Sequence, residues 1–380
     1  MHSMTSPAGC VTGGVDAHTD THDAAALDER GRLLGTHTFS TTPDGNWALL
    51  AWLEAFGPIA VIGVESTGSY AAGLVRFLRS RDIAVVEVNQ PHAHTRRRRG
   101  KSDPIDAEMA ARTALSGHAT AVPKLTDGIV EAIRQLRLAR DSAVKARTAA
   151  FNQLTEVIVT VPDDLRQQLS ARKTTRGKTT LCSRLRPDLK RIHEPAQAAK
   201  FALRSLARRI AELDREIALL DKQLEPLVAT AAPRTTQLIA ISTGHAGQLL
   251  VTAGENIERL RNDGSFAALC GASPIPVSSG RRDRYRINHG GDRDANRTLH
   301  MIAVCRMRYC PRTRAYAQRR IAEGKTKKEI IRCLKRYIAR ETYHTLRADL
   351  ADINQPPARP TTAITINCGA GPTGRTRRRS

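Results

Sequence analysis

The stretch Arg99-Gly-Lys-Ser-Asp-Pro-Ile-Asp-Ala-Glu108 brings opposite charges together at the predicted start of a helix. Asp103 and Asp106 are three residues apart, so their carboxylates lie on one face of that helix near its first turn. A run of four arginines ends at Arg99 and immediately precedes them. Carboxylates can hold a divalent metal, and arginines can hold phosphates. Asp103 followed by Pro104 is also an ordinary helix start. The residues on either side of the stretch are therefore needed to distinguish a metal site from a simple helix start.

The chain before this stretch has the pattern of an α/β domain. Three strand-like segments come first, at residues 13–17, 24–27 and 35–39, and a helical pattern follows at 46–56. Two short β-branched runs, typical of buried strands, then flank an amphipathic helix. The runs are Ile59-Ala-Val-Ile-Gly-Val64 and Ile83-Ala-Val-Val-Glu-Val88. Three strands followed by alternating helices and strands is the order of an RNase-H-like domain, although other α/β folds fit the pattern nearly as well.

Two further acidic residues stand at the ends of predicted buried strands. Asp16 follows a glycine-flanked apolar strand, and Glu65 directly follows Val64. A carboxylate in such a position costs desolvation energy unless something compensates for it, and a divalent cation does so best. Together with Asp103 and Asp106 they form a set of oxygen ligands that suits Mg²⁺ or Mn²⁺. Two such ions about 3.5–4 Å apart could clamp the attacking and leaving oxygens of a phosphodiester. Each acid alone could instead cap a turn or a helix.

The charge balance points to nucleic acid. The 380 residues carry 60 Lys+Arg and 37 Asp+Glu, for a net charge of +23. A basic balance of this size is typical of nucleic-acid binding, although a basic membrane-surface protein would share it. Between Gly271 and Thr345 there are 19 Lys+Arg against 6 Asp+Glu, so more than half of the net charge lies in that segment. No apolar run approaches the roughly 20 residues that span a bilayer, and we expect a cytoplasmic protein.

The cysteines support neither a disulfide framework nor a zinc site. They are seven in number, widely spread, and never form a Cys-x-x-Cys pair. We expect reduced thiols packed as small apolar residues.

The middle of the chain is predicted to be a helical arm. Eight apolar residues alternate steps of three and four, which makes an a/d seam of about four heptads. They are Leu203, Leu206, Ile210, Leu213, Ile217, Leu220, Leu224 and Leu227. Such a seam pairs helices, either between chains or in an antiparallel hairpin. We expect Pro226 to end this helix and the polar residues 170–186 to form a loop before it.

Ser278 and Ser279 lie in the middle of the basic segment, directly before Gly280. A Ser-Ser-Gly sequence is usually only a turn, and spacing alone favours that interpretation. No His or Asp is arranged nearby for acyl transfer. A serine among arginines could instead attack a phosphate, because the cations stabilise the charge that develops.

Several motifs together resemble one known family. They are Gly13-Gly-Val-Asp16, Gly63-Val-Glu-Ser-Thr-Gly-Ser-Tyr70, Lys101-Ser-Asp-Pro-Ile-Asp-Ala107, Phe266-Ala-Ala-Leu-Cys-Gly-Ala-Ser-Pro274, Ser278-Ser-Gly280 and Asn288-His-Gly-Gly-Asp-Arg293. Taken as a set, they resemble the DEDD transposases of the insertion-sequence family one-ten, which are akin to the Piv-type DNA invertases.

The resemblance implies a RuvC-like domain of RNase-H fold that binds Mg²⁺ (or Mn²⁺) through Asp16, Glu65, Asp103 and Asp106. It also implies a mainly helical C-terminal transposase domain whose catalytic serine becomes linked to DNA. The Ser-Gly motif places that nucleophile at Ser279, with Ser278 as the fallback. In such enzymes the two domains form composite active sites across subunits, and an element-encoded guide (bridge) RNA selects donor and target DNA. The implied protein is bacterial, nucleoid-associated and a homo-oligomer, a dimer or tetramer joined through the arm.

We therefore expect a multidomain α/β plus α protein with four segments. These are a RuvC-like catalytic domain at 11–125, a helical coiled-coil arm at 126–232, a C-terminal transposase domain at 233–346, and a disordered basic tail at 347–380. The residues expected to contact nucleic acid are Arg96, Arg97, Arg98, Arg99, Lys101, Arg281, Arg282, Arg284 and Arg286.

The expected function is a DNA transposase or recombinase that cuts and rejoins strands. One alternative is a metal-dependent nuclease such as a Holliday-junction resolvase, or a Piv-type site-specific invertase. A resolvase would need the four acids but not the serine. A second alternative is a non-catalytic RNA-binding protein whose charge is its whole function.

Overall fold

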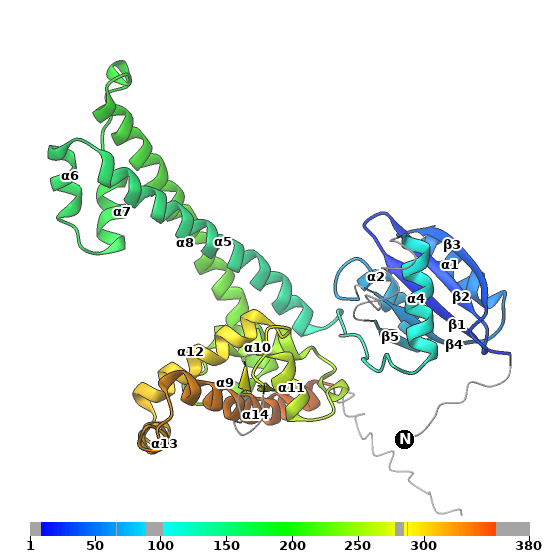
Figure 1. Cartoon of the computed structure of the whole chain (residues 1–380). Helices are drawn as coiled ribbons and strands as arrows, with labels where there is room; N and C mark the ends of the chain where they lie inside the picture. The colour runs from blue at the N-terminus through cyan, green and yellow to red at the C-terminus, as the bar shows by residue number, and fades with distance from the viewer. Residues whose placement is uncertain (1–8, 66, 89–101, 278–284, 287, 355–380) are drawn as a thin grey trace, which may run out of the picture.

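The computed structural model describes residues 9–65, 67–88, 102–277, 285–286 and 288–354. The N-terminal part is a five-stranded sheet with helices on both faces (Figure 1). Its strands are β1 (Val11–Ala17), β2 (Thr21–Leu27), β3 (Leu33–Ser40), β4 (Ile59–Val64) and β5 (Val85–Glu87), in the order β3-β2-β1-β4-β5. β1 runs antiparallel to β2 and parallel to β4. This mixed topology fits the expected RNase-H-like domain.

One face of the sheet is covered by α1 (Pro43–Glu54) and α2 (Ala72–Arg79). The side chain of Thr42 accepts a hydrogen bond from the Gly45 N–H and so begins α1, with Pro43 at the first helical position. Apolar residues from both helices pack with the strands in a single buried cluster, and burial of such side chains is the main favourable term in folding. Its fully buried members include Leu49, Leu53, Ile62, Leu74 and Leu78.

The other face is covered by α4 (Asp103–Leu115), and small residues set its distance from the sheet. A Cβ at Gly14 would lie only 2.2 Å from the Ala107 carbonyl oxygen, and one at Gly63 only 2.5 Å from that of Ala110. The two strands therefore need glycine where the helix crosses them, and the helix in turn presents alanine. This close contact fixes the first turn of α4 beside the ends of β1 and β4.

Two long helices form the arm, α5 (Ile129–Thr160) and α8 (Pro195–Ala231). They run antiparallel, since Arg140 pairs with Asp221 while Arg147, further along α5, pairs with the earlier Asp214 (Figure 1). The two helices therefore form an antiparallel hairpin within one chain, which was one of the two expected ways of pairing. Four heptad residues of α8 are buried, namely Leu203, Ile210, Ile217 and Leu224. Association of arms between chains stays a prediction.

Two expectations about the arm were wrong. Residues 170–186 do not form a simple loop, because α6 (Asp163–Ser170) and α7 (Thr175–Ser183) cap the far end of the hairpin. Cys182 and Leu169 are fully buried there, and this packing outweighs the polar composition. Pro226 does not end α8, which continues to Ala231. A proline removes one helical hydrogen bond, but burial of Val228 and Ala231 beyond it holds the last turn in place.

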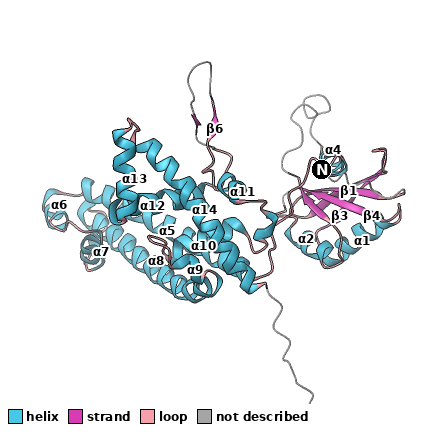
Figure 2. Ribbon diagram, turned by 90° about the horizontal axis from the view of Figure 1, so that it is seen from below, coloured by secondary structure: helices cyan, strands magenta, loops and turns pink. Residues whose placement is uncertain are grey.

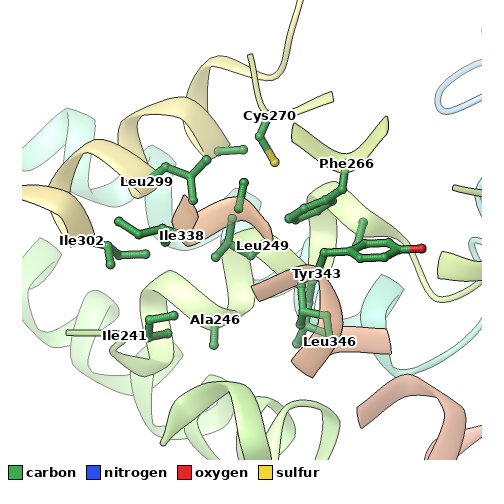
Figure 3. Close-up of a cluster of buried hydrophobic side chains, with 14 of the residues drawn as sticks. Ile241, Ala246, Leu249, Phe266, Cys270, Leu299, Ile302, Ile338, Tyr343 and Leu346 are labelled. Atoms are coloured by element: carbon green, nitrogen blue, oxygen red, sulfur yellow. The ribbon is translucent and has the colours of Figure 1, made fainter. Parts of the chain in front are cut away.

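The C-terminal part is a helical domain around one core (Figure 3). Its elements are α9 (Pro233–Thr236), α10 (Thr243–Ala253), η2 (Ile257–Arg259), α11 (Asp263–Leu269), β6 (Ile275–Pro276), β7 (Tyr285–Arg286), α12 (Arg293–Tyr309), α13 (Pro311–Ala322) and α14 (Lys327–Ile353). Leu249, Phe266 and Tyr343 meet at its centre. The root of the arm joins the same core through Ile133 and Val228, so the arm is anchored in this domain.

The helix α14 extends to Ile353, seven residues into the segment expected to be a disordered tail. Leu350 and Asp349 explain the extension. Leu350 is fully buried, and the Asp349 carboxylate accepts hydrogen bonds from the backbone N–H groups of Arg234 and Thr235 at 3.0 Å. That contact satisfies the first turn of α9.

Asn256 of the C-terminal domain fixes the connection between the sheet and the arm. Its side chain donates to the Pro123 carbonyl and accepts from the Leu125 N–H. The Lys124 ammonium donates to the Val251 carbonyl at 3.0 Å, which again ties the connection to α10. Within the described ranges, no helix has the length and apolar character needed to cross a bilayer.

Candidate functional site

The strand register brings Asp16 and Glu65 to the same edge of the sheet. Val15 pairs with Val64 in the parallel β1–β4 ladder, and the Glu65 N–H donates to the Val15 carbonyl at 3.0 Å. Asp16 stands two residues after Gly14, and Glu65 two residues after Gly63. Because side chains alternate along a strand, both acids point to the face that α4 covers.

The first turn of α4 supplies the other two acids. Asp106 is buried and Asp103 is half-buried. One ligand atom each from Asp16, His18 and Asp103 lies within 4.8 Å of the others, a spacing at which three side chains could share one metal ion. The His18 Nε2 atom is 3.4 Å from an Asp16 carboxylate oxygen and 3.5 Å from one of Asp103. This tight cluster contains two of the four predicted acids. Asp106 is near enough to raise the pKa of Asp16, and Glu65 lies next to β1 at the same edge of the sheet.

The electrostatics of Asp16 fit a cation site. Burial raises the pKa of Asp16, His18 opposes that rise, and the nearby carboxylates of Asp106, Asp103 and Asp23 add to it. The raised pKa of Asp16 thus comes first from burial and then from the negative charge that the described carboxylates gather around it. A divalent ion would neutralise it, and all-oxygen carboxylate sets suit Mg²⁺ and Mn²⁺.

His18 and Asp23 are site residues that the sequence pattern does not predict. Asp23 lies directly opposite Asp16 in the antiparallel β1–β2 ladder and accepts a 2.6 Å hydrogen bond from the Thr38 hydroxyl. A signal for His18 is present in the sequence, because an Asp-x-His spacing in extended chain puts both side chains on one face, and His18 directly follows β1. Asp23 has no comparable local signal, because its position depends on how two strands pair.

Most of the residues expected to contact nucleic acid lie outside the described residues. These are Arg96, Arg97, Arg98, Arg99, Lys101, Arg281, Arg282 and Arg284, and both candidate serines, Ser278 and Ser279, lie outside as well. Arg286 is described and exposed on β7. β6 and β7 pair antiparallel, Ile275 with Arg286, and Figure 2 shows β6 standing apart from the surrounding helices. The serine segment therefore joins the two strands of a short ribbon.

A polar network fixes the base of this ribbon. The Asn296 amide donates to the carbonyls of Cys270 and Gly271, at 3.0 and 2.8 Å. The buried Lys335 ammonium in turn donates to the Asn296 side-chain oxygen at 2.7 Å. Gly291 packs so tightly that a Cβ there would lie 2.3 Å from the Gly271 nitrogen. Two segments of the chain, one before and one after the ribbon, are thus held together by α12 and α14.

Comparison with known families decides the identity. Residues 13–161 match the family of DEDD transposases of IS110, and residues 234–318 match the transposase family IS116/IS110/IS902. The chain belongs to the IS110 family of DEDD transposases. It is therefore an enzyme that acts on DNA, and the alternative of a non-catalytic RNA-binding protein is wrong. No curated protein matches the chain.

The two matched segments contain the two sets of candidate residues. The first runs from β1 to the end of α5 and includes all four predicted acids. The second runs from α9 into α13 and includes the ribbon and both serines. The DEDD family suggests dependence on a divalent metal, and the cluster of Asp16, His18 and Asp103 offers a place for one.

Proposed function

We propose that this IS110 transposase cuts and rejoins DNA strands to move its insertion sequence, using a divalent metal site together with a serine nucleophile. The four carboxylates of Asp16, Glu65, Asp103 and Asp106 would hold Mg²⁺ or Mn²⁺. The observation that carries the proposal is the meeting of Asp16 with Asp103 and Asp106 at one edge of an RNase-H-like sheet.

The bound metal would supply charge stabilisation at the phosphate oxygens of the scissile bond. The protein's own part is to hold the carboxylates in place before the ion arrives. Gly14 and Gly63 do this by letting α4 approach the sheet closely. His18 lies against both Asp16 and Asp103 and so limits their mutual repulsion.

We propose Ser279 as the nucleophile. Its Oγ would form a bond to phosphorus while the bond from phosphorus to a deoxyribose oxygen breaks, and the departing oxygen takes up a proton. The serine–DNA ester keeps the energy of the broken phosphodiester, so a free DNA hydroxyl can later displace the serine and rejoin the strand. The basic ribbon around Ser279 would stabilise the developing negative charge.

We also propose that an element-encoded guide RNA selects the sites, and that chains assemble into a homo-oligomer through the arm. The resemblance to the family and the net charge of +23 support an RNA partner. Exposed apolar residues on the paired helices, such as Leu138 and Leu219, support assembly, because the rest of the described chain leaves them uncovered.

Substitution of the serines tests the nucleophile. Supercoiled plasmid carrying the element ends is incubated with protein, guide RNA and Mg²⁺, and covalent protein–DNA product is measured on a denaturing gel. Ser279→Ala should abolish the product, and Ser278→Ala should retain it. Asp103→Asn should abolish cleavage altogether. Cleavage that persists in Ser279→Ala without a covalent product would instead show a nuclease that uses water.

A further inference from the structure

A groove of about 1140 Å³ lies in the C-terminal domain between α13 and α14, far along the chain from the acids. Residues 237–239 and the end of α12 close its sides. Its walls carry arginine and tyrosine side chains that belong neither to the metal site nor to the serine ribbon. The charged and aromatic side chains of its walls are Arg306, Arg312, Tyr316, Arg319, Tyr337 and Arg340, together with Glu341 and His344.

The groove is strongly positive. Its lining includes four arginines and one carboxylate, Glu341. Arg306 pairs with Glu341 and also donates to the Ile239 carbonyl at 2.9 Å, so that carboxylate is already neutralised. Arg312 and Arg340 are exposed, and neither forms an ion pair with a described acid. Two guanidinium groups thus remain for an anionic ligand, and guanidinium suits phosphate because its donors match the phosphate oxygens.

An exposed aromatic ring stands in the same groove. Tyr337 is 56% exposed, although its ring is large and apolar. Tyr316 supports it from the neighbouring helix, with ring centroids 5.9 Å apart and the rings nearly perpendicular. Tyr316 is itself half-buried and covered by the Arg319 guanidinium, 5.5 Å from its centroid. Tyr337 is therefore held in place with a ring surface left open to solvent.

Phosphate-binding arginines beside an open aromatic ring are the elements of a site for single-stranded nucleic acid, where bases stack on the ring and the backbone follows the positive groove. A duplex would offer the phosphates but not the base faces, which are covered by stacking. An acidic peptide would match the arginines but would leave the flat surface of Tyr337 unused. Cutting and exchange of DNA strands passes through unpaired segments, so the enzyme's own substrate supplies such a ligand.

We propose that the groove between α13 and α14 holds an unpaired segment of the DNA substrate, with a base stacked on Tyr337 and the backbone on Arg312 and Arg340. The site is distinct from the metal-binding acids and from the serine ribbon. It would keep a displaced strand from re-pairing while the other strand is cut and joined.

Binding is measured by fluorescence anisotropy with the full-length protein and a labelled 12-nucleotide DNA strand, in EDTA so that no divalent metal contributes. Tyr337→Leu should raise Kd about tenfold, because base–aromatic stacking has that order of effect. Tyr337→Phe keeps the ring and should bind like the wild type. Tyr337 is exposed, so the leucine variant should fold, and its unchanged melting temperature would confirm this.

Arginine variants distinguish binding in the groove from non-specific attraction of DNA to the protein's positive charge. Arg312→Gln should weaken binding and reduce the slope of log K against log salt by about 0.7, the value for one contact to a single strand. Arg314→Gln is the matched control, because Arg314 is exposed on the same helix but does not line the groove. Equal losses in the two variants would overturn the proposal, since only the overall charge would then matter.

Photocrosslinking gives a local readout on a highly basic protein. DNA carrying 5-iodouracil should crosslink to the peptide that contains Tyr337, and duplex DNA of the same sequence should not. A crosslink confined to other peptides, with Kd unchanged in Tyr337→Leu, would overturn the proposal. Tighter binding of the same sequence as RNA, also dependent on Tyr337, would assign the groove to RNA and would overturn the DNA assignment.

The outcome is independent of the chemistry proposed above. Ser279→Ala and Asp103→Asn should bind the single strand as the wild type does. If the variants show no binding of single-stranded DNA in the groove, the proposal of a metal site and a serine nucleophile still stands. If that proposal fails instead, the proposed binding in the groove still stands.

Discussion

At the scale of single residues, Asp16 shows that a side chain suited to bind a metal ion can lower the stability of the metal-free fold. It is buried among the carboxylates of Asp106, Asp103 and Asp23, and among the described residues His18 opposes their effect on its pKa. Burial raises the pKa of Asp16, so the neutral carboxyl favours the folded state. As pH rises from the ordinary value of 3.8 through the raised pKa, ionisation of Asp16 costs stability. At neutral pH the metal-free site is therefore a strained feature of the domain.

Replacement of Asp16 by asparagine should stabilise the metal-free protein at pH 7. The side chain keeps its size and loses the charge that the site repels. Each kcal/mol gained raises the melting temperature by about 4–8 °C in a domain of 60–100 residues and by about 2–4 °C in one of 150–250 residues, and this domain lies between the two sizes. Differential scanning fluorimetry in EDTA at pH 7 measures the shift. The gain should shrink as the pH falls through the raised pKa of Asp16, because the wild-type carboxyl then takes up a proton. A destabilised variant at pH 7 would contradict the electrostatic argument.

Added metal should reverse the order of the melting temperatures of the wild type and Asp16→Asn. Mg²⁺ or Mn²⁺ binds the folded state only, so it should raise the melting temperature of the wild type with concentration. Asp16→Asn should gain little. A metal-induced rise of equal size in both proteins would place the bound ion elsewhere.

At the scale of elements, the packing of α4 on the sheet decides where Asp103 and Asp106 stand. Gly14 is the point of closest approach, since an added Cβ would meet backbone atoms of Ala107 and Ala111 at 2.2 Å. Backbone cannot yield as a flexible side chain can. The helix would have to move, and the two acids would move with it.

Gly14→Ala should therefore destabilise the domain by about 1–3 kcal/mol, the usual cost of overpacking, and should abolish metal binding. Gly73→Ala is the control, because Gly73 lies in α2 with open space around it. The control should be neutral or slightly stabilising. Calorimetric titration with Mn²⁺ and thermal melts check both variants. Wild-type metal affinity in Gly14→Ala would show that the position of α4 does not matter.

The ribbon base makes a second prediction at this scale, and it rests on the proposed role of Ser279. Lys335→Met keeps the length of the side chain but removes the donor to Asn296. Burial lowers the pKa of Lys335, so loss of this charged group should cost little stability. The rate of covalent protein–DNA product should fall about tenfold or more, because misplacement of a nucleophile by about 1 Å has effects of that size or larger. An unchanged rate would show that the hydrogen bonds of Asn296 and Lys335 do not position the serine.

The elements also show how far sequence reasoning reaches. Strands and helices of the sheet domain follow local apolar patterns, and so do the four acids that end or begin them. Asp23 enters the site through strand pairing, which local patterns do not specify, whereas His18 follows Asp16 at a two-residue spacing that the sequence does show. The helices α6 and α7 were missed because their polar, arginine-rich residues are held by burial of Leu169 and Cys182 against the arm. The helical turn beyond Pro226 was missed for the same kind of reason, since Val228 packs in a distant core.

At the scale of the whole molecule, the arm carries apolar residues that nothing in the described chain covers. Leu138 on α5 and Leu219 on α8 are 63% and 65% exposed. Buried heptad residues such as Ile217 already hold the hairpin together within one chain. The exposed leucines are thus available for the proposed contact between chains.

Leu138→Glu combined with Leu219→Glu should reduce the mass measured by light scattering toward that of one chain, 41.6 kDa. Both side chains are exposed, so the melting temperature should change little. Lys222→Glu, at an exposed position on α8, changes the charge by the same amount and is the matched control. A wild-type protein that is already monomeric, or an assembly that the leucine variants leave unchanged, would exclude the arm as the interface.

The four-carboxylate metal site is tested most directly by Mn²⁺ binding to the full-length protein, followed by electron paramagnetic resonance. Asp16→Asn, Glu65→Gln, Asp103→Asn and Asp106→Asn should each weaken Mn²⁺ binding at least about tenfold, since each removes one charged oxygen ligand. Asp214→Asn, on the arm, should leave it unchanged. Wild-type Mn²⁺ affinity in all four site variants would contradict a metal centre at this edge of the sheet.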